Sequence, residues 1–277
     1  MPNRAVPNRA APNRAVPTAV PLRVRPVLRD VLRLVVRHPW LLVGLTLPVQ
    51  IASFVIFSLA AGAATLAGSG SDDAVVFFGY DVIFLVALVL AGTVVSVLFA
   101  LPQILAYDAW QGRRIAFGAR ARDVARCVPA LLLLAAPFVF VFEIGLGLFV
   151  LPALVISAMW GLYQLAVLEE GQGLRGLSRS YALARPYLAP LTFMWSLIFA
   201  CWFILPSLVW SVLSGEPSFM VTGTLWDLAA GLLWPQTLLQ FGCDLLSNTL
   251  HTALAAVLFS RLTRLEAHED DVADVFD

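Results

Sequence analysis

The chain has 277 residues, of which 60% are hydrophobic and only 13% are charged, and its mean hydropathy is +0.85. Soluble domains usually carry about twice that share of charged residues, so this composition excludes an ordinary soluble domain and indicates an integral membrane protein. The 18 basic residues, all Arg, balance 18 acidic ones, and the three cysteines and three histidines form no CxxC motif and no Cys/His cluster, which argues against zinc, haem, iron–sulfur and disulfide frameworks.

The two ends of the chain predict disordered tails. Residues 1–25 begin with a PNRA motif repeated three times, and proline at that frequency removes helix hydrogen-bond donors. The last thirteen residues, 265–277, carry six acids and no Arg, which is typical of a solvated acidic tail. Between the first tail and the first apolar stretch, Arg29, Arg33 and Arg37 recur every fourth position and predict a basic amphipathic helix at the membrane interface.

The uncharged stretches predict the membrane-spanning helices, because crossing ~30 Å of hydrocarbon takes ~20 helical residues. Residues 127–168 contain a single charge, Glu143, and are too long for one helix. They therefore predict two helices that meet near 145–152, where Gly147 and Pro152 can turn the chain. The predicted spans are approximately 40–61, 83–106, 128–148, 152–168, 188–213 and 235–260.

Arginine is confined to alternate connections between these spans. It occurs before the first span, in the second and fourth connections and after the sixth span. Cytoplasmic loops carry the excess of Arg, so both termini are expected in the cytoplasm and the chain in the plasma (inner) membrane. The predicted fold is an all-α integral membrane protein over residues 26–264. It has six transmembrane helices in three hairpins, each hairpin preceded by a basic amphipathic interfacial helix.

One stretch of the chain resembles a known family. Residues 168–185 contain an acid, a glycine, an Arg-Ser pair and an aromatic residue in order, namely Glu169, Gly173, Arg179, Ser180 and Tyr181. This order resembles the signature of a bacterial and archaeal membrane-domain family named after glycerophosphoryl diester phosphodiesterases. Tyr107-Asp108 with Gly112-Arg113-Arg114 resembles the matching segment before the third span. The resemblance covers about residues 26–264 and implies a six-helix membrane domain of mostly unknown activity, without the catalytic domain fused to some relatives.

Two acids, Glu143 and Asp244, fall inside predicted spans, where an unpaired charge is costly. Asp244 belongs to a polar stripe along one face of the sixth span. The stripe comprises Gln236, Gln240, Asp244, Ser247, Asn248 and His251. One interpretation is a proton or solute path formed by this stripe with Glu143. The other, which we favour, is that these side chains hydrogen-bond to neighbouring helices, as most intramembrane polar groups do.

The segment before the fifth span also has two interpretations. Its residues could contact lipid phosphate or a cytoplasmic partner, or its Arg residues could serve only to orient the chain, which is the general rule and the interpretation we favour. The candidate contacts are Glu169, Gly173, Arg175, Arg179, Ser180, Tyr181 and Arg185.

No enzyme template is present, because the chain lacks GxSxG, HExxH, Walker and Rossmann glycine motifs. We therefore expect no catalytic site, no cofactor, no metal and no nucleic-acid partner. The predicted function is a non-enzymatic scaffold that interacts with the bilayer, with anionic lipids or with another membrane protein. The alternatives are a small proton-coupled transporter that uses the polar stripe and, less favoured, an intramembrane lipid enzyme that uses Asp244 and His251.

Overall fold

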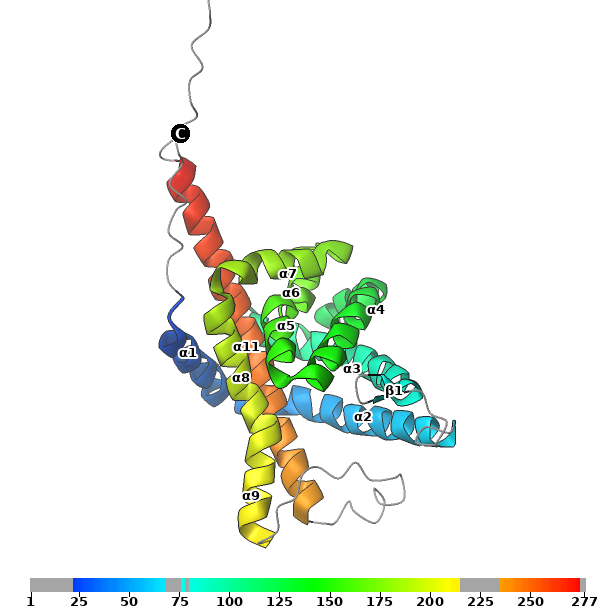
Figure 1. Cartoon of the computed structure of the whole chain (residues 1–277). Coiled ribbons are helices and arrows are strands. Elements are labelled where there is room, and N and C mark those ends of the chain that lie inside the picture. Colours follow the sequence, from blue (N-terminus) through cyan, green and yellow to red (C-terminus); the bar gives the residue numbers. More distant parts are fainter. Residues whose placement is uncertain (1–21, 68–75, 78–79, 215–234, 275–277) are drawn as a thin grey trace, which may run out of the picture.

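The computed structural model describes residues 22–67, 76–77, 80–214 and 235–274 (Figure 1). This part of the chain is helical, apart from a two-residue antiparallel ladder between β1 (Val76–Phe77) and β2 (Tyr80–Asp81). The all-α prediction is therefore confirmed. Residues 1–21 of the predicted basic tail lie outside the described residues. The predicted end of the tail at residue 25 is wrong, because a helix already begins at Val24.

The first helix is α1 (Val24–Arg37). Its apolar side, with Val27, Val31 and Leu34, is almost fully buried, whereas Arg33 and Arg37 are exposed. The amphipathic helix predicted from the four-residue arginine spacing is thus present. It ends at Arg37, and after His38 the next helix begins with Pro39. Proline suits this first position because the N–H groups of a helix's first turn have no partner within the helix.

The first two long helices, α2 (Pro39–Leu66) and α3 (Val82–Trp110), pack against each other. The second pair is α4 (Phe117–Leu148) and α5 (Val150–Trp160), separated by one extended residue, Phe149. The turn predicted near 145–152 is therefore confirmed. The predicted separate interfacial helix before the third span is wrong, because α4 runs unbroken from Phe117. An ion pair joins Arg120, in this first part of α4, to Asp108 at the end of α3.

The predicted fourth span, 152–168, is broken after α5 and continues as α6 (Tyr163–Glu169). At the break, a Cβ on Gly161 would come within 2.7 Å of the Trp195 ring and 2.5 Å of the Ser157 carbonyl oxygen. The close approach of Trp195 therefore requires glycine here. The sequence did not predict this break, because the partner that fills the space comes from a later helix.

The segment after α6 consists of η1 (Gly173–Arg175), α7 (Gly176–Ala184) and η2 (Arg185–Tyr187). The predicted fifth span follows as α8 (Leu188–Phe199), a π-helical turn η3 (Ala200–Ile204) and α9 (Leu205–Ser214). Pro206 lacks the N–H that would bond to the carbonyl four residues earlier, which accounts for the irregular turn just before it.

The last helix, α11 (Pro235–Asp274), begins at the predicted start of the sixth span and extends well beyond the predicted end. The prediction of a disordered tail from residue 265 is therefore wrong up to Asp274. Glu266, within the predicted tail, forms an ion pair with Arg179 of α7, and this anchor favours continuation of the helix past Arg264.

The long helices diverge from a shared core (Figure 1). In this view α2 and α3 extend to one side, whereas α8, α9 and α11 run from top to bottom. The main core lies where α1, the end of α3, α6, α7, α8 and the middle of α11 meet. Residues 253–259 of α11 are at most 1% exposed there.

Five helical segments of the described chain are long and apolar enough to cross a membrane. They are Pro39–Ala64, Val82–Trp110, Phe117–Leu148, Val150–Glu169 and Gly173–Val209. The polar stripe lowers the hydropathy of α11, which is not among them. Large apolar side chains on the sides of these helices are exposed, for example Leu90 at 64% and Leu208 at 58%. Such surfaces are typical of contact with lipid, and the architecture is that of a multi-pass membrane protein.

Candidate functional site

The arginine-bearing segments meet at one end of the molecule in a network of ion pairs. Asp108, which is 2% exposed at the end of α3, accepts two hydrogen bonds from Arg120 of α4 at 2.7 and 2.6 Å. Arg120 also lies 2.7 Å from Glu169 at the end of α6, and Arg113 donates to the same carboxylate at 2.8 Å. We call Asp108, Arg113, Arg120 and Glu169 the arginine network. Its two-sided guanidinium–carboxylate contacts are the strongest kind of ionic hydrogen bond.

The network affects the ionisation of Arg113, which lies in the connection between α3 and α4. The hydrogen bond to Glu169 raises the pKa of the Arg113 guanidinium above its ordinary value, and the negative charges of Glu169 and Asp108 act in the same direction. Gly112, one residue before it, has a φ of +69°, so the turn that brings Arg113 over the end of α3 favours glycine.

A second ionic contact joins α6, α7 and α11. Arg179 donates to Glu170 at 2.6 and 3.0 Å and to Glu266 at 2.6 and 2.5 Å. Both edges of its guanidinium are occupied, so Arg179 has little capacity left for a lipid phosphate. The sequence analysis placed Arg179 among the candidate phosphate contacts, and the structure gives it a carboxylate on each side instead.

The other residues of the 168–185 segment divide into packing residues and exposed ones. Ser180, which is fully buried, donates to the Met159 carbonyl at 3.0 Å and accepts from the Leu162 N–H at 3.3 Å. Its hydroxyl therefore satisfies backbone groups freed where α5 ends and α6 begins. Gly173 has a φ of +51° and turns the chain into α7. Tyr181, Arg175 and Arg185 are exposed, and neither of these arginines has an ion-pair partner in the described part of the chain.

The polar stripe on α11 contacts α2 and α3. Asp244 accepts from Gln240 at 2.6 Å and from Gln50 of α2 at 3.4 Å, and the Gln50 carbonyl oxygen accepts from Asn248. We call Gln50, Gln240, Asp244 and Asn248 the amide cluster. Gln236 belongs to α11, but its side chain lies outside the described residues.

One turn further along α11, polar side chains again pair across helices. The hydroxyl oxygens of Thr249 and of Thr46 on α2 lie 3.0 Å apart, and the Nε2 atom of His251 lies 3.2 Å from the Nε2 atom of Gln103 on α3. The His251 ring packs against Trp195 at a centroid distance of 4.7 Å. Each of these contacts joins two helices, which is the arrangement expected of packing contacts.

Sequence reasoning missed Thr46, Gln50 and Thr249. The spacing of Thr46 and Gln50, four residues apart in an otherwise apolar helix, was a usable signal for a polar face of α2. Ser247 was predicted, and its hydroxyl is buried with no described hydrogen-bond partner.

Glu143 does not join the stripe. It lies on α4, which packs against α3, α5 and α6, whereas α11 packs against α1, α2 and α3. No described hydrogen bond or ion pair links Glu143 to Asp244. The structure therefore separates two acids that the sequence analysis placed on one possible path.

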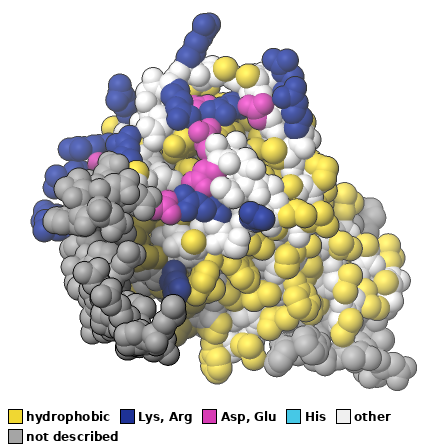
Figure 2. Space-filling view, turned by 90° about the horizontal axis from the view of Figure 1, so that it is seen from above, with side chains coloured by type: hydrophobic (Ala, Val, Ile, Leu, Met, Phe, Trp, Pro, Cys, Tyr) yellow, Lys and Arg dark blue, Asp and Glu magenta, His cyan; other side chains and the backbone are white. Residues whose placement is uncertain are grey.

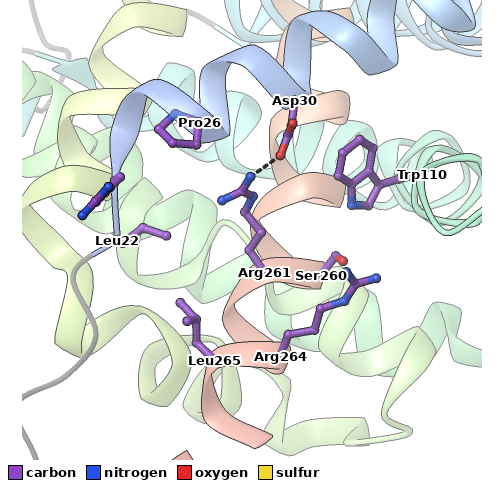
Figure 3. Close-up of a pocket in the computed structure, with 9 residues that line it drawn as sticks. Leu22, Pro26, Asp30, Trp110, Ser260, Arg261, Arg264 and Leu265 are labelled. Atoms are coloured by element: carbon purple, nitrogen blue, oxygen red, sulfur yellow. Dashed lines mark hydrogen bonds and ion pairs between the residues drawn. The ribbon is translucent and has the colours of Figure 1, made fainter. Parts of the chain in front are cut away.

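A cavity of about 560 Å³ lies between α1 and α11, beside the end of α3 (Figure 3). Sequence reasoning did not predict it, because its walls come from both ends of the chain. Its lining residues are Leu22, Arg23, Pro26, Asp30, Trp110, Ser260, Arg261, Arg264 and Leu265. Figure 3 shows Arg261 reaching from α11 to Asp30 of α1, with which it forms an ion pair. We call this space the α1–α11 pocket.

Metal-ligand residues do not gather in the part of the chain that the structure describes: no group of three or more His, Cys, Asp or Glu side chains could hold an ion there. The three cysteines, Cys127, Cys201 and Cys243, are free thiols.

Comparison with known proteins gives no relative to set beside this geometry. No protein-family model, no curated protein and no solved structure matches the chain. The resemblance of residues 168–185 to the phosphodiesterase-named membrane family therefore stays a prediction. What the site can do has to be argued from its own residues.

Proposed function

We propose that the chain is a six-span, non-enzymatic protein of the inner membrane that binds anionic lipids on its cytoplasmic side and holds both termini there. One observation carries this proposal: the segments that bear arginine are tied to one another. Ion pairs link α4 to α3 through Arg120, α7 to α11 through Arg179, and α11 to α1 through Arg261. All of these segments therefore share one end of the molecule, and Figure 2, viewed from above Figure 1, shows basic and acidic side chains gathered on that face.

The same contacts support six crossings. The chain leaves the arginine-rich end in α2 and returns to it at Asp108 of α3. It leaves again in α4 and returns at Glu169 of α6. It then leaves in α8 and returns at Arg261 of α11. A chain that departs and returns three times crosses six times, with residues 235–260 of α11 as the sixth span. The polar face of this span is covered by α2 and α3, which accounts for its lower hydropathy.

The lipid-binding role is supported by the arginines that the protein itself does not pair. Ten described arginines have no described carboxylate partner: Arg23, Arg25, Arg29, Arg37, Arg114, Arg122, Arg126, Arg175, Arg185 and Arg264. Guanidinium groups at this level of a membrane are attracted to anionic head groups by about 1 kcal/mol each. A surface of this kind holds the protein against anionic lipid without any catalytic group.

The proposed membrane topology is tested by attaching a topology reporter after residue 70, 115, 172 or 220 in the full chain. We expect cytoplasmic signals from the fusions at 115 and 172 and external signals from those at 70 and 220. A cytoplasmic signal at 70 or 220 would overturn the six-span arrangement. Lipid binding is tested on the purified chain by the phospholipids that remain attached after detergent extraction, with enrichment of anionic over zwitterionic lipid as the expected result.

A second function, proton-coupled transport, has one observation in its favour. Asp244 contacts amide donors and no arginine in the described chain, so its carboxyl lacks the cationic partner that every acid of the arginine network has. Reconstituted vesicles with a pH gradient test this: Asp244→Asn would abolish a proton flux that the unmodified chain supports. The separation of Glu143 from Asp244 favours the first function.

A further inference from the structure

The α1–α11 pocket lies at the arginine-rich end, beside a helix whose apolar side is buried and whose basic side is exposed. On the proposed function, this end faces the cytoplasmic head groups. Residues from both ends of the chain wall the pocket, so it exists only in the folded protein.

Positive charge in the pocket exceeds negative charge. Three guanidinium groups, from Arg23, Arg261 and Arg264, line it together with one carboxylate, that of Asp30. Asp30 is already engaged by Arg261 and, at 3.5 Å, by Arg33. No described carboxylate is therefore left for Arg23 or Arg264, and the pocket attracts an anion.

Two donors in the pocket are held in place by the same residue. Gln111, just after α3, accepts from Arg264 at 2.9 Å and donates to the Ser260 hydroxyl at 2.8 Å. Since the Ser260 oxygen already accepts this bond, its own proton is available to donate, and no described acceptor takes it. Ser260 is only 1% exposed. Figure 3 shows Ser260 and Arg264 side by side on α11, next to Trp110. A hydroxyl and a guanidinium at one point suit the oxygens of a phosphate group.

The remaining wall is apolar, with Leu22, Pro26, Trp110 and Leu265. A free inorganic ion gains nothing from such a wall, whereas the glycerol and first acyl carbons of a phospholipid do. Tryptophan at the level of the head groups is also a common neighbour of lipid.

We infer that the α1–α11 pocket binds the phosphate head group of an anionic phospholipid, with Arg264, Ser260 and Arg23 contacting the phosphate and Gln111 positioning the first two. This inference rests on the proposed function and adds to it a single stoichiometric site, distinct from the general attraction of the exposed arginines.

The test is native mass spectrometry of the full chain in detergent, titrated with dioctanoyl phosphatidylglycerol. The unmodified chain is expected to bind one lipid in preference to further ones. Arg264→Gln is expected to weaken this first binding about tenfold, since a charge-assisted hydrogen bond is lost. Arg23→Gln is expected to weaken it about threefold. Arg23 makes no described hydrogen bond, so its effect does not depend on changed folding.

Arg175→Gln is the matched control, because it removes the same charge from an exposed residue outside the pocket and should change the first binding less than twofold. If Arg175→Gln weakens binding as much as Arg264→Gln, the pocket is not the site, although the proposed lipid-binding function survives. If the unmodified chain retains no anionic lipid, the proposed function itself fails.

Three further ligands distinguish the sources of the phosphate. Millimolar inorganic phosphate or glycerol phosphate is expected to leave the bound lipid in place, and dioctanoyl phosphatidylcholine is expected to bind more weakly than phosphatidylglycerol. Displacement by inorganic phosphate at the lipid's own concentration would assign the pocket to a free anion and overturn the lipid inference. Equal binding of phosphatidylcholine would overturn the requirement for a net negative lipid.

Discussion

The arginine network and the amide cluster each surround a carboxyl group inside the helix bundle, the first with guanidinium groups and the second mainly with amides. In the arginine network, Asp108 is buried and receives a two-point contact from Arg120, with Glu169 adjoining. In the amide cluster, Asp244 receives hydrogen bonds from Gln240, Gln50 and the Trp202 side chain, and contacts no described guanidinium. A carboxylate held by guanidinium groups is needed as an ion, because its loss leaves a partly buried positive charge without its main partner. A carboxyl surrounded by amides can be replaced by another amide. The cost of replacing each acid should therefore differ.

The largest expected effect comes from Asp108→Asn. The amide cannot provide the charge that Arg120 requires, so we expect a loss of about 3 kcal/mol in the free energy of unfolding, the low end for a broken buried pair. Thermal or denaturant unfolding in detergent measures it. Asp123→Asn is the matched control: Asp123 lies 3.8 Å from the same arginine but is 44% exposed, and such pairs contribute less than about 1 kcal/mol. Equal effects of the two substitutions would show that Asp108 is not the residue that orders the network.

Ser180→Ala is expected to have the second largest effect. It tests a buried hydroxyl that hydrogen-bonds to backbone groups and takes part in no ion pair. It removes the acceptor of the Leu162 N–H and a donor to the Met159 carbonyl. An unpaired buried backbone group costs about 1–3 kcal/mol, so we expect a loss of about 2 kcal/mol. Ser178→Ala, two residues away on an exposed side, serves as control. Faster hydrogen exchange at residues 159–163 in Ser180→Ala alone would locate the effect at the break between α5 and α6.

Arg179→Gln should have a smaller effect, because its partners Glu170 and Glu266 are partly exposed. We expect a loss of about 1 kcal/mol, concentrated where α7 holds the end of α11. Hydrogen exchange should therefore quicken past Arg264. Arg175→Gln, without a described partner, should leave exchange there unchanged. An unaffected α11 in Arg179→Gln would mean that the helix continues without this anchor.

Local and periodic features of the fold were predictable from sequence. The arginine spacing predicted α1, and the uncharged stretches predicted six spans, five of which coincide with apolar helical segments of the structure. The single charge in residues 127–168 led to a turn that the structure places at Phe149. Each of these signals lies within one window of sequence, where composition and helical period determine the outcome.

Features that depend on distant partners were not predictable. The break at Gly161 requires Trp195, the continuation of α11 involves Arg179, and the α1–α11 pocket needs both ends of the chain. The same applies to the candidate site. The stripe on α11 was visible from its spacing, but the sequence does not say that Gln50 and Thr46 of α2 are its partners. Glu143 was assigned to one possible path with Asp244 only because both acids fall inside predicted spans, and a place within a span says nothing of a residue's position around the bundle.

The smallest expected effect is also the sharpest test of the comparison. Asp244→Asn exchanges a carboxyl for an amide, and the amide oxygen can still accept the hydrogen bond from Gln240. We therefore expect the unfolding free energy to change by less than about 1 kcal/mol, or to rise slightly as a costly intramembrane acid is removed. Asp108→Asn, the same chemical change measured under the same conditions, is the reference. If Asp244→Asn proves as destabilising as Asp108→Asn, the carboxylate must be held as an ion by a cation, and transport becomes the better explanation of the amide cluster. If it is tolerated and no proton flux depends on it, the cluster acts as packing between α2 and α11.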